Sequence, residues 1–225
     1  TFDGGYSWTN VGTSGADKYV TFNPLLGFAG LSQSTFWRSV DTGKTWIAKT
    51  LSSNYFGVNL NSLSIVTPTH YCIVGDMGQI FDSRDGGSTW SRQSWGYPNG
   101  FGRLAFSDSL HGHVCANDGK ILNTTDGGKT WSSSSVGLTI ETQTIAFPTR
   151  DTGYVGSNKQ LYRTIDGGKT WDSTSTNFTT KTHNMMWFPS KDTGYVGADI
   201  NSQIFITYNG GKTVSLVDFW DMGID

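Results

Sequence analysis

Asp166-Gly167-Gly168-Lys169-Thr170-Trp171 is one of six versions of the same phrase in this chain. We call each version a box. Successive boxes start 38, 44, 41, 40 and 43 residues apart, and the other five start at Asp3, Asp41, Asp85, Asp126 and Asn209. A recurrence of this period decides the fold, because each copy is one unit of supersecondary structure that buries its apolar face only against its neighbours.

Each repeat reads as four short strands separated by turn residues. In the repeat that contains Asp166, strand-like patterns cover 144–147, 154–155 and 160–163, and a polar segment follows Trp171. Four strands in roughly 42 residues match one blade of a β-propeller, whereas a solenoid has a shorter period. We therefore predict an all-β fold, a single β-propeller domain over residues 1–225 with four-stranded repeats near 11–52, 53–95, 96–136, 137–176 and 177–220.

The form of the box predicts a tight turn between the third and fourth strands. Glycine adopts positive φ angles without steric cost, and a leading Asp or Asn side chain accepts hydrogen bonds from N–H groups of the turn. A Trp offers a large apolar face that suits the gap between adjacent blades. The spacing fits neither an EF-hand calcium loop nor a phosphate-binding loop that opens a helix. We predict structural roles for the following box residues: Asp3, Asp41, Trp46, Asp85, Trp90, Asp126, Trp131, Asp166, Trp171 and Asn209.

The number of blades is left open between two alternatives. Residues 1–10 carry only the end of a repeat, namely the Asp3 box and a short strand after it. We expect a five-bladed ring in which this N-terminal strand pairs into the last blade and closes the ring. The alternative is a six- or seven-bladed ring whose missing part precedes Thr1, which would leave edge strands that need covering.

The charge balance and the cysteine count argue against several classes of partner. The chain has 16 basic and 18 acidic residues, a net charge of -2 and no basic run, so we expect no nucleic-acid partner. No apolar run is long enough to span a bilayer. The two cysteines, Cys72 and Cys115, are too few for a disulfide framework or a Cys-based zinc site. We expect buried thiols, no metal and no cofactor.

The box with its preceding Ser or Thr resembles the Asp-box, or bacterial neuraminidase repeat. The longer frame that starts at Asp151-Thr152-Gly153-Tyr154 and again at Asp192-Thr193-Gly194-Tyr195 is more similar to the repeats of photosystem II assembly/stability factor-like propellers. The resemblance covers nearly the entire chain. It implies a protein-binding scaffold outside the cytoplasm (secreted, periplasmic or lumenal), with the export signal absent from this chain. Asp-boxes also occur in sialidases, xyloglucanases and sortilin-type receptors, so the fold alone does not give the function.

The residues that glycosidase chemistry needs are not identifiable in the sequence. A sialidase would require three arginines that converge on a carboxylate, but Arg38 and Arg163 share one repeat position, Arg84 adjoins a box, and only Arg103 is well placed near the channel. Paired carboxylates would have to come from loop residues, for which the candidates are Asp76, Asp118, Glu141 and Asp199. We assign no catalytic residue.

Aromatic residues give the best functional signal. The loop from Trp95 to Phe101 interrupts the repeat pattern on the face opposite the boxes, where propeller binding sites usually lie. Exposed aromatics of this kind suit sugar stacking or a protein hot spot, while the structural alternative is that they fold over the channel mouth and complete the core. The binding candidates are Tyr55, Phe56, Trp95, Tyr97, Phe101, Arg103 and Phe178, and the N-glycosylation motif marks Asn123 and Asn177.

Together these observations favour a non-catalytic β-propeller that presents its loop face to a protein partner. A carbohydrate-binding propeller, or a glycoside-hydrolase or sialidase-like one, is the alternative, and in that case a sugar is the partner.

Overall fold

The structure, a computed structural model, describes residues 19–23, 27–32, 35–39, 41, 44–51, 58–98, 100–135, 142, 144–157, 160–177, 185–197 and 203–217. These residues form five antiparallel four-stranded sheets, which we call sheets A to E in chain order. Sheet A contains β1 (Tyr19–Asn23), β2 (Gly27–Ser32), β3 (Thr35–Ser39) and β4 (Ile47–Thr50). Sheet B contains β5 (Leu60–Ile65), β6 (Tyr71–Gly75), β7 (Gln79–Ser83) and β8 (Ser91–Ser94).

The last three sheets repeat this up-and-down order. Sheet C contains β9 (Phe101–Phe106), β10 (Gly112–Ala116), β11 (Lys120–Thr124) and β12 (Ser132–Ser135). Sheet D contains β13 (Thr144–Ala146), β14 (Gly153–Ser157), β15 (Gln160–Thr164) and β16 (Asp172–Asn177). Sheet E contains β17 (Met185–Trp187), β18 (Gly194–Gly197), β19 (Ile204–Thr207) and β20 (Ser215–Leu216).

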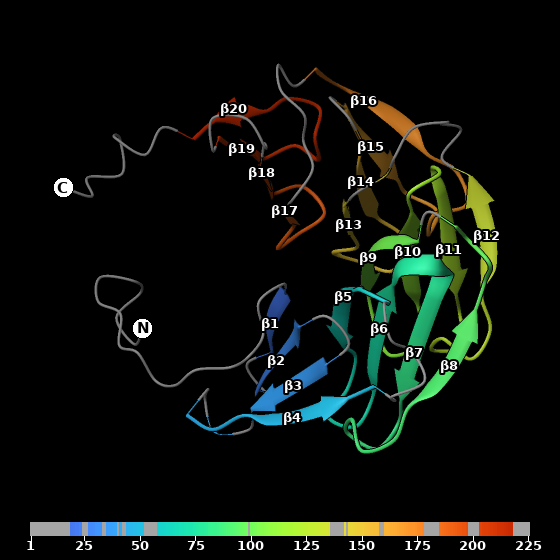
Figure 1. The fold of residues 1–225 in the computed structure, drawn as a ribbon. Coiled ribbons are helices and arrows are strands. Elements are labelled where there is room, and N and C mark those ends of the chain that lie inside the picture. The colour runs from blue at the N-terminus through green and yellow to red at the C-terminus, as the bar shows by residue number, and fades with distance from the viewer. Residues whose placement is uncertain are drawn as a thin grey trace.

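The sheets are arranged as blades, with the first strand of each innermost and the fourth outermost (Figure 1). The first strands of successive sheets contact one another, β1 with β5, β5 with β9, β9 with β13 and β13 with β17. This is the arrangement that the repeat predicts, and the predicted all-β propeller class is confirmed. No helix in the described part of the chain is long and apolar enough to cross a membrane.

The apolar core lies between the blades and not within a single one. The cluster between sheets B and C, for example, joins Cys72, Val74 and Ile80 of sheet B to Leu104 and Trp131 of sheet C. The second strands β6, β10 and β14 are buried along their whole length, whereas the outermost strand β8 is largely exposed. Each blade therefore depends on its neighbours for burial, as the repeat analysis predicts.

Each described box forms a self-contained turn. In the Asp85 box, one carboxylate oxygen accepts hydrogen bonds from the Ser83 hydroxyl at 2.9 Å and the Thr89 N–H at 2.8 Å, while the other accepts from the Thr89 hydroxyl at 2.6 Å. Gly86 and Gly87 have φ angles of 71° and 86°, a conformation that other residues adopt only with strain. Asp41, Asp126 and Asp166 accept the equivalent hydrogen bonds within their own boxes, and Asn209 accepts those of the Thr207 hydroxyl and the Thr213 N–H.

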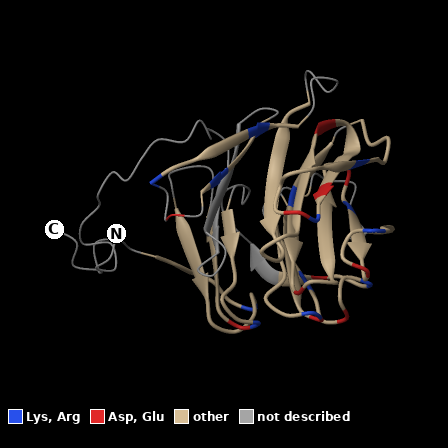
Figure 2. Cartoon of the chain, turned by 90° about the horizontal axis from the view of Figure 1, so that it is seen from below, with Lys and Arg blue, Asp and Glu red and all other residues tan. Residues whose placement is uncertain are grey.

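The boxes place charged residues along one edge of the sheets. Figure 2 shows acidic and basic residues along the turns at the lower edge of the sheets, where the boxes lie. The turns between second and third strands and the blade-to-blade connections lie at the opposite ends of the strands. We call that opposite side the loop face.

Sheet E takes its fourth strand from its own repeat, because β20 pairs with β19 at Phe205 and Ile206. The sequence predicts that the N-terminal strand pairs into this sheet. Residues 1–10, including Asp3, lie outside the described residues, so closure by that segment stays a prediction.

Candidate functional site

The loop from Trp95 to Phe101 lies over a short 3-10 turn, Asp76–Gly78, between β6 and β7. The Trp95 N–H donates to the Gly78 carbonyl at 3.0 Å, and the glycine at position 100 lies so close to Asp76 that a Cβ there would be 2.8 Å from the Asp76 Cα. The turn is held in an unusual conformation, because Met77 has a φ of 56°. Met77 and Trp95 are 56% and 36% exposed, so two large apolar side chains face solvent from adjoining segments.

A polar network fixes this turn from below. The Asp76 carboxylate accepts hydrogen bonds from the Asn59 and Asn61 side-chain amides, both at 2.8 Å. The Asn61 amide also donates to the Phe101 carbonyl at 2.9 Å, and the Arg103 guanidinium donates to the Asn61 carbonyl at 2.8 Å. The network ties sheet B to sheet C directly under the exposed pair, and it positions Arg103 at the loop end of the channel between the first strands.

A second aromatic residue borders the exposed pair. Tyr97 is half-buried, with its ring centroid 5.4 Å from that of Phe101, and the Lys120 ammonium lies 5.1 Å from the centre of the Tyr97 ring. Lys120 also forms an ion pair with Asp118 at 3.1 Å, and this hydrogen bond raises the pKa of Lys120. We define the loop-face patch as Met77, Trp95, Tyr97, Asp118 and Lys120. It combines apolar surface with a polar rim, the composition of a protein-binding hot spot.

Phe101 requires a correction. The sequence makes it a binding candidate or, in the alternative, a part of the core; the structure places it as the first residue of β9, fully buried in the core between sheets B and C. The exposed loop therefore ends before Phe101, because the chain enters the sheet at this residue. Tyr55, Phe56 and Phe178 lie outside the described residues, so their roles stay predictions.

The two glycosylation candidates differ. The Asn123 amide nitrogen donates to the Ser134 hydroxyl at 2.8 Å, and its oxygen bonds the His113 ring at 2.8 Å. Both polar atoms of the Asn123 side chain are therefore engaged within the fold, and its role as a glycan acceptor stays a prediction. Asn177 ends β16, and its side chain lies outside what the structure describes.

Most of the side chains that line the channel between the first strands are apolar. A cavity of about 310 Å³ is lined by residues such as Leu63, Ala105, Phe147 and Trp187 from four sheets, with a smaller cavity of about 120 Å³ beside Arg103. Among the side chains that line the larger cavity, Ser64 carries a hydroxyl and none is charged, so no charged group is available there to orient a polar substrate.

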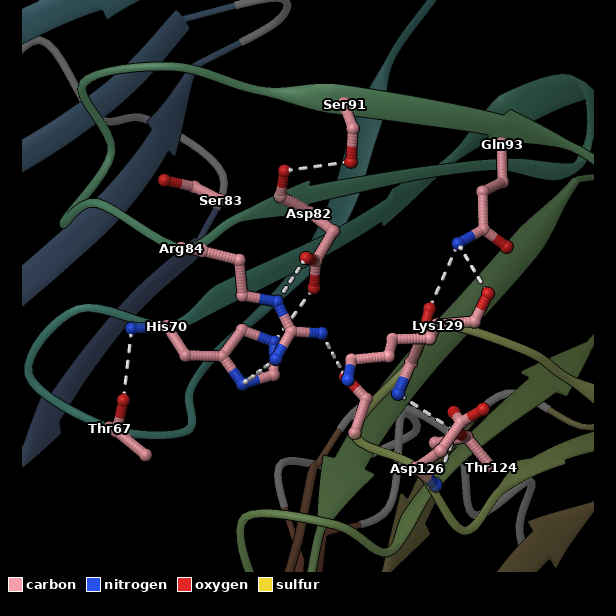
Figure 3. Close-up of polar contacts among 12 residues, drawn as sticks. Thr67, His70, Asp82, Ser83, Arg84, Ser91, Gln93, Thr124, Asp126 and Lys129 are labelled. Carbon is pink, nitrogen blue, oxygen red and sulfur yellow. Dashed lines mark hydrogen bonds and ion pairs between the residues drawn. The ribbon is translucent and has the colours of Figure 1, made fainter.

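The box face holds a polar network, with His70 and Asp82 buried and Arg84 partly exposed, that the sequence did not reveal (Figure 3). One Asp82 carboxylate oxygen lies 2.7 Å from His70 Nε2, and the other accepts from Arg84 Nε at 2.6 Å. Arg84 also donates across the blade boundary to the carbonyl of Gly127 in the next box. Arg38 makes the same kind of contact with the Gly86 carbonyl at 3.0 Å. These arginines clamp successive blades, and they do not converge on one anion as a sialidase would require.

The thiols and the titratable clusters give no sign of catalysis. Burial raises the pKa of Cys72 far above its usual range and that of Cys115 to about 11, so neither thiol is an activated nucleophile. Burial also lowers the pKa of His113 to about 4, and this ring stacks on Phe147 of the next sheet with centroids 3.4 Å apart. Among the described residues, no group of three His, Cys, Asp or Glu side chains could hold a metal ion.

The fold and the interblade core define a β-propeller. The family model described as the DUF6242 beta propeller domain matches residues 6–158, and the chain belongs to this family. No curated protein matches the chain.

Solved structures share the fold at low sequence identity. A structure of YCF48 bound to D1 peptide matches 89% of this chain with a TM-score of 0.66 and 18% identity. YCF48 from Cyanidioschyzon merolae matches 95% with a TM-score of 0.73 and 16% identity. The GH74 enzyme of Niastella koreensis matches 88% with a TM-score of 0.67 and 17% identity. This chain covers 66% and 76% of the two YCF48 chains but only 30% of the GH74 enzyme.

Proposed function

We propose that this chain is a non-catalytic scaffold that holds a peptide segment of a protein partner on its loop-face patch. The observation that carries the proposal is the exposure of Met77 and Trp95 on adjoining segments that the Asp76 network holds rigid. Exposed apolar side chains normally cost solubility, and a pair fixed in place is typical of an interaction site.

The neighbouring groups suit a peptide better than a small molecule. Lys120 and Asp118 provide one charge of each sign at the rim, next to the Tyr97 ring. Backbone amides and mixed side chains of a peptide can pair with such a rim while apolar side chains cover Met77 and Trp95. The YCF48 structure with a D1 peptide supports the proposal, since that protein has the same fold and binds a peptide.

Peptide selection tests the proposal. A random peptide phage library would be selected on the purified chain, and the enriched peptides would be titrated against variants. Met77→Ala and Trp95→Ala should each weaken binding at least about tenfold, as expected for residues worth roughly 1.4 kcal/mol or more. Tyr208→Ala is the matched control, because Tyr208 is 71% exposed but lies beside the Asn209 box on the opposite face. Selected peptides that bind the Met77→Ala and Trp95→Ala variants as tightly as the unchanged chain would contradict the proposal.

A carbohydrate-binding propeller is the second candidate. The GH74 likeness and the exposed Trp95 favour it, since an indole face stacks well on a sugar ring. Two of the four candidate carboxylates are described, and both are engaged, Asp76 by two asparagine amides and Asp118 by Lys120. A glycan array and a reducing-end assay on polysaccharides separate the candidates. Sugar binding that Trp95→Ala abolishes, without peptide binding, would replace the first proposal by the second.

A further inference from the structure

Met77 has a backbone conformation that favours other residue types. Among the described residues it is the only non-glycine residue with a positive φ, and its φ of 56° and ψ of 26° lie close to the left-handed helical region. In the turn between β10 and β11 the same place, two residues before the third strand, is taken by Asp118. The repeat itself therefore does not require an apolar side chain here, and a residue kept in a disfavoured conformation indicates a role for its side chain.

The backbone around Met77 is held by its neighbours. The Gln79 side-chain amide donates to the Met77 carbonyl at 3.0 Å. A Cβ on Gly78 would lie 2.8 Å from the backbone nitrogen of Tyr97, so the loop that follows β8 packs directly against this turn. Because the turn cannot withdraw, the Met77 thioether stays at the surface of the loop-face patch, where the residue is 56% exposed.

Among the described sulfur atoms, those of two methionines are open to oxidation. Cys72 and Cys115 are buried, and burial raises the pKa of both thiols, which removes the thiolate that a peroxide attacks. Met186 is partly buried, whereas Met77 and Met185 are 56% and 57% exposed. Mild oxidation of the folded chain should therefore fall on Met77 and Met185.

Oxidation would give the Met77 side chain a strongly polar group. The sulfur lone pair forms a bond to one oxygen of a hydroperoxide while the O–O bond breaks, and the hydroperoxide leaves as water or an alcohol. The product, methionine sulfoxide, has an oxygen that accepts hydrogen bonds from water. A peptide that covers Met77 would remove this water, and a buried polar atom without a partner opposes binding.

We propose that Met77 is a redox-sensitive modification site, at which oxidation by a hydroperoxide releases a bound peptide from the loop-face patch. The inference rests on the proposed function, because it concerns the regulation of the same patch. The release is reversible, since methionine sulfoxide reductases restore the thioether. Met185 gives the contrast within the chain, because it is equally exposed but lies with Arg103 at the smaller cavity, outside the patch.

Peroxide treatment of the purified chain tests the inference. With hydrogen peroxide, mass spectrometry should show Met77 and Met185 oxidised at comparable rates, severalfold faster than Met186. The tightest peptide selected on the unchanged chain should bind the Met77 sulfoxide form at least about tenfold more weakly. In the Met185→Leu chain, the loss of binding should follow the fraction of Met77 sulfoxide and should be reversed by methionine sulfoxide reductases. Whatever the affinity of the Met77→Leu chain, peroxide should not lower it.

The outcomes distinguish a failure of this inference from a failure of the proposed function. If Met77→Ala weakens peptide binding but oxidation of Met77 does not, the patch binds peptides and the redox inference alone is overturned. If no peptide binds the unchanged chain, or if Met77→Ala has no effect, both proposals are overturned. Much slower oxidation of Met77 than of Met185 would also overturn the inference. So would a lower melting temperature of the oxidised chain, because the loss of binding would then come from the fold.

Discussion

Replacement of Gly153 by Ala should destabilise the propeller through one steric contact. Gly153 begins β14, and a Cβ at this position would lie 2.4 Å from Cζ of Phe147. The Phe147 ring cannot easily move aside, because it stacks on His113 with centroids 3.4 Å apart and meets the Trp171 ring edge-on at 5.9 Å. The added methyl group therefore forces a shift in the contact between sheets C and D.

The expected cost follows from overpacking of a filled core, about 1–3 kcal/mol of unfolding free energy. For a chain of this size, each kcal/mol lowers Tm by roughly 2–4 °C. Gly197→Ala is the matched control, because a Cβ there would lie 3.4 Å from the Met185 Cβ, an ordinary contact distance. Urea unfolding followed by circular dichroism should show a lower midpoint for Gly153→Ala and a nearly unchanged one for Gly197→Ala.

At the equivalent position of sheet B, the chain has a larger residue in place of the glycine and a smaller residue in place of the phenylalanine. Tyr71 in β6 is equivalent to Gly153 in β14, because each pairs with the residue two positions before a box. In sheet B the residue that pairs with Tyr71 from the first strand is Ile65, at the position that Phe147 has in sheet D. Phe147→Ile should accordingly cost less in the Gly153→Ala background than alone, giving a favourable coupling energy in a double-mutant cycle. A Gly153→Ala chain as stable as the unchanged chain, or strictly additive costs, would refute the steric reasoning.

Three further predictions concern the boxes and the thiols. The hydrogen bond from the Thr89 hydroxyl is the main cause that lowers the pKa of Asp85 from 3.8 to about 2. The ionised Asp85 therefore contributes its full stabilisation above pH 4, and this stabilisation is lost as the pH falls toward 2. Acid unfolding of the Thr89→Val variant should begin at a higher pH than that of the unchanged chain. Asn209→Asp should raise the urea midpoint at pH 7 by the equivalent of about 0.5–1.5 kcal/mol, because a carboxylate accepts the Thr213 hydroxyl as the other boxes do. Cys72 and Cys115 should react with Ellman's reagent only as fast as the chain opens, and fast labelling of the native protein would contradict their burial.

The repeat gave the fold because it combines two independent signals. The box fixes where each third strand ends, and the period of four strands fixes the blade, so the sheets of Asp85 and Asp166 follow directly from the sequence. The same reasoning misplaced Phe101. From sequence, the run from Trp95 to Phe101 is one aromatic loop, and nothing in it marks the residue at which the strand begins. Only the contact of Phe101 with the core between sheets B and C separates the buried end from the exposed start.

The network of His70, Asp82 and Arg84 shows a second limit. His70 ends the turn before β6 and Asp82 lies on β7. They meet because the chain turns between Thr67 and His70 and because Cys72 pairs with Asp82. The contact between these two side chains could be predicted from the sequence only if the register of β6 and β7 were also known. The contact of Arg84 with Gly127 depends in addition on how far one blade rotates against the next, which the repeat period does not encode.

The chemistry of their polar groups explains why the boxes stabilise the fold and the loop-face patch is suited to binding. In the Asp126 box, the Thr124 hydroxyl and the hydroxyl and N–H of Thr130 already donate to the carboxylate, and the Gly128 carbonyl accepts the Trp131 indole N–H at 3.1 Å. A turn whose polar atoms are satisfied internally has little left to offer a ligand, although it is rich in Asp and recurs in every blade. Met77 and Trp95 have the opposite character, because their backbone is fixed by neighbours while their side chains have apolar surface without a cover. Binding specificity in this propeller should therefore depend on the loop residues that differ between repeats, and substitutions within the boxes should change stability alone.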